Sequence, residues 1–315
     1  MYHSITSPFV NMLKTNFLDD AHNLLLQQDT HNGMELLFQG LKQLHTTSID
    51  GHWQNFVNAT ALKHPIKELI HQCPFTNHAF FKPRGYVGDA ELIDFIYGKS
   101  AEKQQAMDSL AASICEYTLN TPAARAVRYR RKRLARCIDE VATNETNPSI
   151  LSLAAGHLRE VEFSKAMING QIGCLYALDQ DKENIELIQR EYADYKISAV
   201  VGSVRQLFSD QITFSNLSLV YAAGLFDYLS DKTAQKLIAK SFGYLKPGGR
   251  MLVANFLPNI PDVGYMETFM DWFLIFRSPE EMVALFDVLP EDQLSSLLLT
   301  FDPDENIVFI EAVKN

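Results

Sequence analysis

The sequence contains little cysteine and little positive charge, and it has no long apolar run. Its four cysteines form no Cys-x-x-Cys pair and no signal-peptide pattern precedes them, so we expect reduced thiols in a cytoplasmic protein. No apolar run approaches the ~20 residues of a membrane helix. The net charge of -10 argues against nucleic acid or an anionic membrane as a partner, because phosphate binding needs a basic field.

Apolar residues, in contrast, are plentiful. They make up 47% of the 315 residues, against 21% for charged residues, so a packed core is expected. The length allows one large domain and a smaller one. With nucleic acid and membranes disfavoured, we expect a small-molecule substrate, and the sequence leaves the oligomeric state open.

Metal-site patterns are also missing. Eight of the nine histidines lie before residue 80, and His64, His71 and His78 are seven residues apart. Pro65 and Pro74 interrupt any single helix that could align them, and the chain has no His-Glu-x-x-His motif. We therefore predict no metal site.

The first part of the chain predicts helices. Up to about residue 145, apolar residues recur at spacings of three and four, with few β-branched alternations. Thr121 and Pro122 begin a helix that is expected to run to about Ala142. The polar linker 144–148 follows, so we place an all-helical domain at 1–145 and a second domain at 146–315.

The second part opens with an apolar run that stops at a small, glycine-containing turn. This run, Ile150–Gly156, is followed by a second apolar run, Cys174–Asp179, which ends in an acid. Two such runs joined by a helix are typical of a nucleotide-binding βαβ unit, although the full Gly-x-Gly-x-x-Gly pattern is missing. Gly156 lets a ligand approach the backbone, and a carboxylate at Asp179 suits ribose hydroxyls.

Further strands predict the rest of the sheet. A strand before Gly202, one within 217–225 and one within 245–256 complete five βα repeats. The runs 295–301 and 307–313 are separated by a turn-rich linker and predict a hairpin. This mostly parallel, seven-stranded sheet with antiparallel strands at its carboxyl end resembles the Rossmann-like fold of the class I S-adenosylmethionine (SAM) methyltransferases.

A basic helix precedes the first strand. Residues 125–136 hold seven basic residues, and on a helix Val127, Leu134 and Ile138 form one apolar stripe. Arg131 completes that stripe and is expected to point inward, where it needs a carboxylate, either Glu160 or that of a ligand. The other basic side chains are expected to form a solvated face.

Several long motifs resemble one family more closely, the methyltransferases similar to 3-hydroxypalmitic acid methyl ester synthase, which makes a quorum-sensing fatty ester. They are Gly-Tyr-x-Gly-Asp within 85–89, Gly-Leu-Phe-Asp-Tyr-Leu within 224–229, and the Tyr-Met-Glu and Asp-Trp segments within 265–272. The resemblance spans roughly residues 80–280. It implies SAM as the methyl donor and a small carboxylic acid, such as a hydroxy fatty acid, as the acceptor.

With this resemblance, the candidate cofactor residues take specific places. We expect the backbone of 154–156 to meet the methionine end, Asp179 to bind the ribose, 202–204 to border the adenine and 221–224 to form the floor beside the acceptor. The complete cofactor set is Ala154, Ala155, Gly156, Asp179, Gln180, Gly202, Ser203, Val204, Tyr221, Ala222, Gly224 and Arg131. The alternatives are that Gly156 only makes a turn, that Asp179 caps the following helix and that Tyr221 packs in the core.

The acceptor determines which catalytic groups are needed. A carboxylic acid is ionised at neutral pH and needs orienting donors rather than a base. The candidate donors are Arg84, Tyr86, Tyr228, Tyr265 and Arg277. A hydroxyl acceptor would need a base, for which Asp89, Asp227 and Glu267 are candidates. Asp89 could instead cap the following helix, and the helical domain is expected to cover the site as a lid. Methylation of an unrelated acceptor and a non-catalytic SAM sensor remain alternatives.

Overall fold

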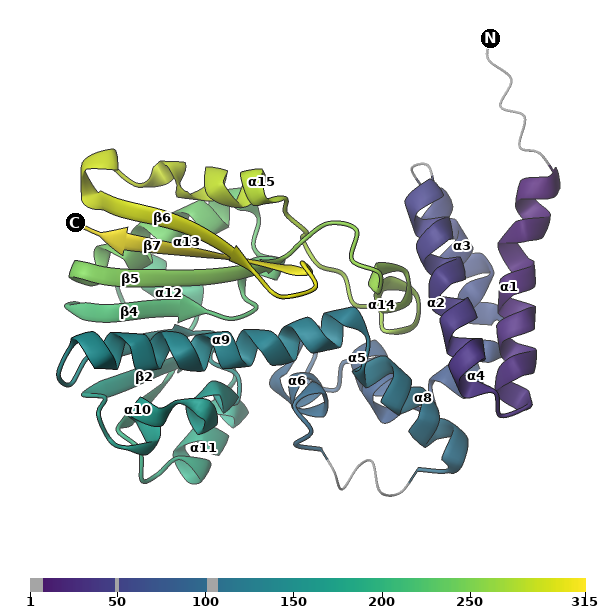
Figure 1. Ribbon diagram of the computed structural model, residues 1–315, viewed down its shortest axis with the longest axis horizontal. Coiled ribbons are helices and arrows are strands. Elements are labelled where there is room, and N and C mark those ends of the chain that lie inside the picture. Colours follow the sequence, from purple (N-terminus) through teal and green to yellow (C-terminus); the bar gives the residue numbers. More distant parts are fainter. Residues whose placement is uncertain (1–7, 49–50, 101–106) are drawn as a thin grey trace, which may run out of the picture. The chain divides into compact units, whose positions relative to one another are not determined.

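A computed structural model describes residues 8–48, 51–100 and 107–315 (Figure 1). The chain forms two compact units, one of Met1–Arg125 with Asn259–Phe273 and one of Ala126–Pro258 with Leu274–Asn315. This division differs from the predicted boundary at residue 145. Residues 126–145 belong with the sheet, and the later segment Asn259–Phe273 belongs with the helices. None of the helices in the described ranges combines the length and apolar character that crossing a membrane requires.

The helical unit contains only helices and turns in its described residues, as the apolar spacing predicts. Its elements are α1 (Pro8–Leu26), α2 (Thr30–Thr47), α3 (His52–Ala59), η1 (Ala61–Lys63), α4 (Ile66–Ile70), α5 (Pro74–Phe81), α6 (Ala90–Ile96), α8 (Ser109–Leu119) and α14 (Val263–Phe269). Helix α14 packs against α2, where a Cβ on Gly264 would lie 2.8 Å from the Leu41 carbonyl carbon. This close approach of the two backbones requires glycine.

The sheet unit begins within α9 (Pro122–Asn144), whose first residues belong to the helical unit. Its strands are β1 (Ser149–Leu153), β2 (Cys174–Asp179), β3 (Ile197–Val201), β4 (Leu217–Ala222), β5 (Leu245–Phe256), β6 (Leu294–Phe301) and β7 (Ile307–Lys314). Its other helices are η2 (Arg159–Phe163), α10 (Lys165–Ile168), α11 (Lys182–Glu191), α12 (Val204–Phe208), η3 (Phe226–Tyr228), α13 (Asp231–Gly243), α15 (Pro279–Ala284), η4 (Leu285–Val288) and η5 (Glu291–Gln293).

The seven strands form one sheet in the order β3-β2-β1-β4-β5-β7-β6. The first five are parallel, and β7 runs antiparallel to both of its neighbours, β5 and β6. The predicted seven-stranded sheet and carboxy-terminal hairpin are therefore confirmed. This order and direction define the Rossmann-like class I methyltransferase fold, preceded by a helical region.

Side-chain alternation gives each face of the sheet its own helices. Along β7, Val308, Ile310 and Ala312 belong to a buried cluster with α13, α15 and η4, and Phe309 lies on the other face, 6.1 Å from the Tyr129 ring of α9. Helix α9 runs along the sheet in Figure 1. Both faces are covered, as a mostly parallel sheet requires.

Candidate functional site

The candidate site lies at the carboxyl ends of the parallel strands. Strands β2 and β4 both pair with β1, so Leu178 and Ala222 lie on either side of Leu153. The chain leaves β1 for β2 on one side and later returns to β4 on the other. This reversal of strand order is the place where open α/β sheets bind ligands.

The loop after β1 has an unusual backbone. Ala154, Gly156 and Leu158 all adopt left-handed conformations, with φ of 51°, 56° and 55°. For the two residues with side chains this costs on the order of 1 kcal/mol each. The amide of Ala155 donates to the carbonyl of Leu178 at 3.0 Å, which ties the loop to the end of β2.

Asp179 lies beside this loop, at the end of β2. One carboxylate oxygen accepts from the Gly156 amide at 2.7 Å, and the other accepts from the Asp181 amide at 2.8 Å and from Asn184 Nδ2 at 3.3 Å. Burial raises the pKa of Asp179, and these donors oppose that rise. The cap of α11 is Asp181, which accepts from the Glu183 amide, so the capping alternative for Asp179 is wrong.

A buried polar network joins β4 to η2. The Tyr221 hydroxyl donates to Glu160 at 2.7 Å, and both residues are buried. Burial raises the pKa of Glu160, while Tyr221 and the nearby Arg131 and Arg130 guanidiniums favour its charged form. Arg131 is 6% exposed, as its place on the apolar stripe predicts, and its guanidinium carbon lies 4.2 Å from the Phe163 ring centroid. Tyr221 is therefore a core residue. Of this residue, only the backbone could take part in the predicted floor between cofactor and acceptor.

Arg130 is the residue that the sequence analysis missed. It was assigned to the solvated face of the basic helix, but it is 4% exposed. Its Nη1 lies 3.6 Å from Asp227 Oδ2, and its Nη1 and Nη2 would lie 3.3 Å from a Cβ on Gly224. The sequence does contain an indication that Arg130 is buried. Arg130 lies four residues from both Ala126 and Leu134, which are buried, so helical spacing places it on the same face of the helix.

Asp227, a candidate base, follows β4 and is 2% exposed. Its side chain accepts from the Phe256 amide at 2.8 Å, at the carboxyl end of β5. Burial raises the pKa of Asp227 to about 6, against the opposing effects of Arg130 and Arg277. The acid thus loses its charge more readily than an exposed aspartate.

Arg277, predicted to orient the acceptor, has a structural position instead. Its Nε donates to Asp231 at 3.0 Å, its Nη1 donates to the Phe226 carbonyl and Asn255 Oδ1, both at 2.8 Å, and its Nη2 donates to the Leu229 carbonyl. Every nitrogen of this buried guanidinium has a protein acceptor. Arg277 therefore fixes the turn after β4, and the predicted donor role is wrong.

The other sheet-unit candidates lie at or near the strand ends. A Cβ on the buried Gly202 would lie 2.7 Å from Leu178 Cδ1, and Ser203 forms a capping box at the start of α12, whose first residue is Val204. Gln180 is exposed and Tyr228 is 37% exposed, whereas Ala222 is buried. The ligand contacts predicted for these residues therefore stay predictions.

In the helical unit, most predicted acceptor residues contact other side chains of that unit. Arg84 donates to Glu91 at 3.1 Å, the Tyr265 and Thr76 hydroxyls lie 2.8 Å apart, and Glu267 accepts from Trp53 at 2.7 Å. Asp89 caps α6 through the Leu92 amide and contacts His78 at 2.9 Å, so the capping alternative is confirmed. Tyr86 is half-buried.

The helical unit also has a cavity of about 910 Å³, between α2, α8 and the start of α9. Phe38 and Tyr117 form its aromatic wall, and the Tyr117 hydroxyl donates to Glu35 at 2.6 Å. This hydrogen bond is the main cause that lowers the pKa of Glu35, followed by one from Gln39. A cavity of this volume is large enough for a small ligand.

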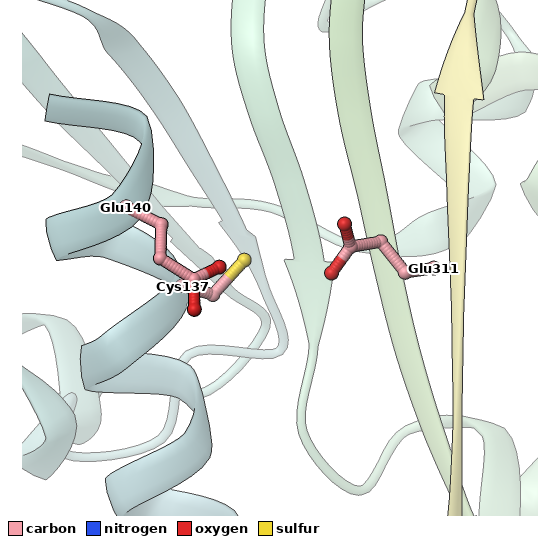
Figure 2. Close-up of side chains that lie close together, drawn as sticks. All are labelled: Cys137, Glu140 and Glu311. Atoms are coloured by element: carbon pink, nitrogen blue, oxygen red, sulfur yellow. The ribbon is translucent and has the colours of Figure 1, made fainter. Parts of the chain in front are cut away.

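One group in the described residues has the composition of a metal site. Cys137, Glu140 and Glu311 lie close together between α9 and β7, and Figure 2 shows their side chains. Arg133 donates to Glu311 at 3.0 Å, and Arg250 donates to Glu311 and Glu140 at 2.8 and 2.9 Å. Burial also raises the pKa of Cys137 to about 12, so its thiol stays protonated. The arginines neutralise the carboxylates, and the group is an internal ion-pair network.

Comparisons with known proteins agree with the fold. No family model matches the sequence, and neither does any curated protein. A protein from Bordetella parapertussis described as a possible exported protein is similar over 98% of this chain and 99% of its own, with a TM-score of 0.59 and 15% identity. A candidate methyltransferase from Thermobifida fusca is similar over 72% of this chain and 94% of its own, with a TM-score of 0.50 and 15% identity. The N-methyltransferase NodS from Bradyrhizobium japonicum is more distant, with a TM-score of 0.44, 13% identity and coverage of 70% and 99%.

Proposed function

We propose that the protein is a SAM-dependent methyltransferase that esterifies a small carboxylic acid. The observation that carries the proposal is the position of Asp179 in a sheet with class I methyltransferase topology. Its carboxylate lies against the Gly156 amide, at the strand ends where the strand order reverses. The fold-level likeness to a candidate methyltransferase supports the same activity.

The residues at the carboxyl ends of these strands fit the groups of SAM. Asp179 is a buried carboxylate whose Oδ2 accepts from one protein donor, the Gly156 amide, and can accept from a ribose hydroxyl as well. The left-handed Gly156 lets a ligand approach the loop backbone. The exposed Gln180 directly follows this acid. We assign the ribose to Asp179 and the methionine end to the loop that follows β1.

The acceptor is proposed from the family resemblance and from chemistry. A carboxylate oxygen attacks the sulfonium methyl group, the new O–C bond forms as the C–S bond breaks, and S-adenosylhomocysteine (SAH) leaves. No proton moves, because the acid is already ionised at neutral pH. The protein then has to hold both partners in line and exclude water. The helical unit remains a proposed lid, and a cytoplasmic location remains a prediction.

The test uses the full-length protein, methyl-labelled SAM and 3-hydroxypalmitate. We expect label that base hydrolysis releases as methanol, the signature of a methyl ester. Asp179→Asn should weaken SAH binding about 10- to 100-fold, because hydrogen bonds to a charged group contribute about 1.5–3 kcal/mol. Isothermal titration calorimetry measures this affinity.

Asp302→Asn is the matched control. Asp302 is also buried and accepts from backbone amides, those of Asn306 and Ile307, but it lies in the turn between β6 and β7. We expect it to cost stability and leave SAH affinity unchanged. Full SAH affinity in Asp179→Asn would rule out the ribose assignment.

A hydroxyl acceptor is the second candidate, and Asp227 favours it. Its pKa of about 6, raised by burial, leaves the acid ionised at neutral pH and in the range of a general base. The same assay separates the two candidates. A transferred label that base does not release would support a hydroxyl acceptor, whereas SAH binding without any transfer would favour a sensor.

A further inference from the structure

Arg130 carries a buried positive charge that forms no hydrogen bond with the described part of the chain. Its Nε and Nη1 are fully buried without a hydrogen-bond partner. The Nη1 atom is 3.6 Å from Asp227 Oδ2, which is within ion-pair range but too long for a good hydrogen bond. The guanidinium carbon also lies 5.9 Å from the Phe256 ring centroid.

Burying a guanidinium without hydrogen-bond partners is costly. A buried charge needs a counter-charge and hydrogen bonds to offset its lost hydration. Of the two acids near Arg130, Asp227 accepts from the Phe256 amide and lies within ion-pair range of Arg130 without a hydrogen bond to it. Glu160 also accepts from Tyr221 and lies within the electrostatic reach of Arg131. The neighbouring protein groups therefore leave donors of Arg130 unused.

The position of Arg130 indicates where its partner would lie. Gly224 follows β4, and a Cβ there would lie 3.3 Å from both Nη1 and Nη2 of Arg130. The forked end of the guanidinium therefore lies against the loop at the carboxyl end of β4. Register places this strand end beside that of β1, whose loop contacts Asp179.

We propose that Arg130 binds a ligand carboxylate at the carboxyl end of β4. The planar guanidinium fork matches a carboxylate, and the two can form paired hydrogen bonds. This inference rests on the proposed function, which supplies two carboxylates: that of the methionine part of SAM and that of the acceptor acid.

The experiment separates these two sources. Isothermal titration calorimetry of the full-length protein measures the affinity of SAH and of 5′-methylthioadenosine, which keeps the nucleoside and sulfur but lacks the amino acid. If Arg130 binds the cofactor carboxylate, Arg130→Gln weakens SAH at least 10-fold and leaves 5′-methylthioadenosine unchanged. If Arg130 binds the acceptor, SAH affinity is unchanged and KM for 3-hydroxypalmitate rises at least 10-fold. Either result supports the proposal.

Two further variants keep the test decisive. Arg130→Lys retains the charge without the fork, and we expect it to weaken the same ligand at least 5-fold. It decides the matter if Arg130→Gln does not fold, as judged by its melting temperature. Arg133→Gln is the control, because Arg133 lies on the same helix but pairs with Glu311, and ligand affinity should not change.

Two outcomes would overturn the proposal, and they are distinguishable. A folded Arg130 variant with wild-type SAH affinity and wild-type KM would overturn the carboxylate site and leave the proposed function standing. Wild-type protein that binds neither SAH nor 5′-methylthioadenosine would overturn the proposed function and this inference with it.

Discussion

Two buried arginines contact the turn that follows β4, and their surroundings differ. Arg277 is 2% exposed and each of its nitrogens donates to a protein acceptor. Arg130 is 4% exposed, and its closest acid oxygen, on Asp227, is 3.6 Å away. Burial alone therefore does not tell a structural arginine from one that is ready for a ligand. The number of acceptors around the guanidinium makes the distinction.

The largest effect is expected from removing the satisfied arginine. Arg277→Met leaves Asp231, Asn255 and two backbone carbonyls without their donor. The Asp231 side chain is 74% exposed and regains water, but each buried acceptor left without its donor costs about 1–3 kcal/mol, so the free energy of unfolding should fall by about 3–5 kcal/mol. Urea denaturation measures the loss, and Arg136→Met, an exposed position on α9, should change stability by less than about 0.5 kcal/mol. A loss below about 1 kcal/mol in Arg277→Met would contradict the structural role.

Asp227, which is close to both arginines, should make the free energy of unfolding depend on pH. Burial raises the pKa of Asp227 to about 6, above about 3.9 for an exposed aspartate. Between these two pH values the folded protein binds more protons than the unfolded chain. The stabilising contribution of Asp227 is therefore fully present below about pH 4 and is lost as the pH rises through about 6. The loss is at most about 3 kcal/mol. In Asp227→Asn it should disappear, which urea denaturation between pH 4 and 7 measures, and an unchanged pH profile would show that Asp227 is not its source.

The same comparison shows how far the sequence alone could go. Apolar runs and turn residues predicted the sheet and its terminal hairpin because strand formation depends on local patterns. The inward position of Arg131 followed from helical spacing in the same way. The assignment of 259–273 to the helical unit was missed, because the close packing of Gly264 on Leu41 joins residues that are far apart in the sequence.

The candidate site was predictable only in part, for a related reason. Asp179 was found because its position at a strand end is local information, and the structure places it against Gly156. The sequence does not reveal which charged side chains satisfy one another. The sequence therefore predicts an acceptor donor at Arg277 and a solvated side chain at Arg130. The three-dimensional contacts instead show a structural role for Arg277 and burial of Arg130.

The smallest effect is expected from Gly224→Ala, which shifts Arg130 without removing it. A Cβ on Gly224 would lie 3.3 Å from Nη1 and Nη2 of Arg130, close enough to displace the guanidinium by a few tenths of an ångström. Gly224 does not have a positive φ, so Gly224→Ala should change the free energy of unfolding by less than about 1 kcal/mol. We expect a several-fold loss of affinity for the ligand that Arg130 binds, measured by the same calorimetry. Gly243→Ala is the control, because a Cβ there meets nothing within 4 Å and ligand affinity should not change. Since Arg130 keeps its charge in Gly224→Ala, an affinity loss there and not in Gly243→Ala would tie ligand binding to the loop that Arg130 contacts rather than to net charge. Wild-type affinity in Gly224→Ala would instead mean that Arg130 does not need its present position beside the loop.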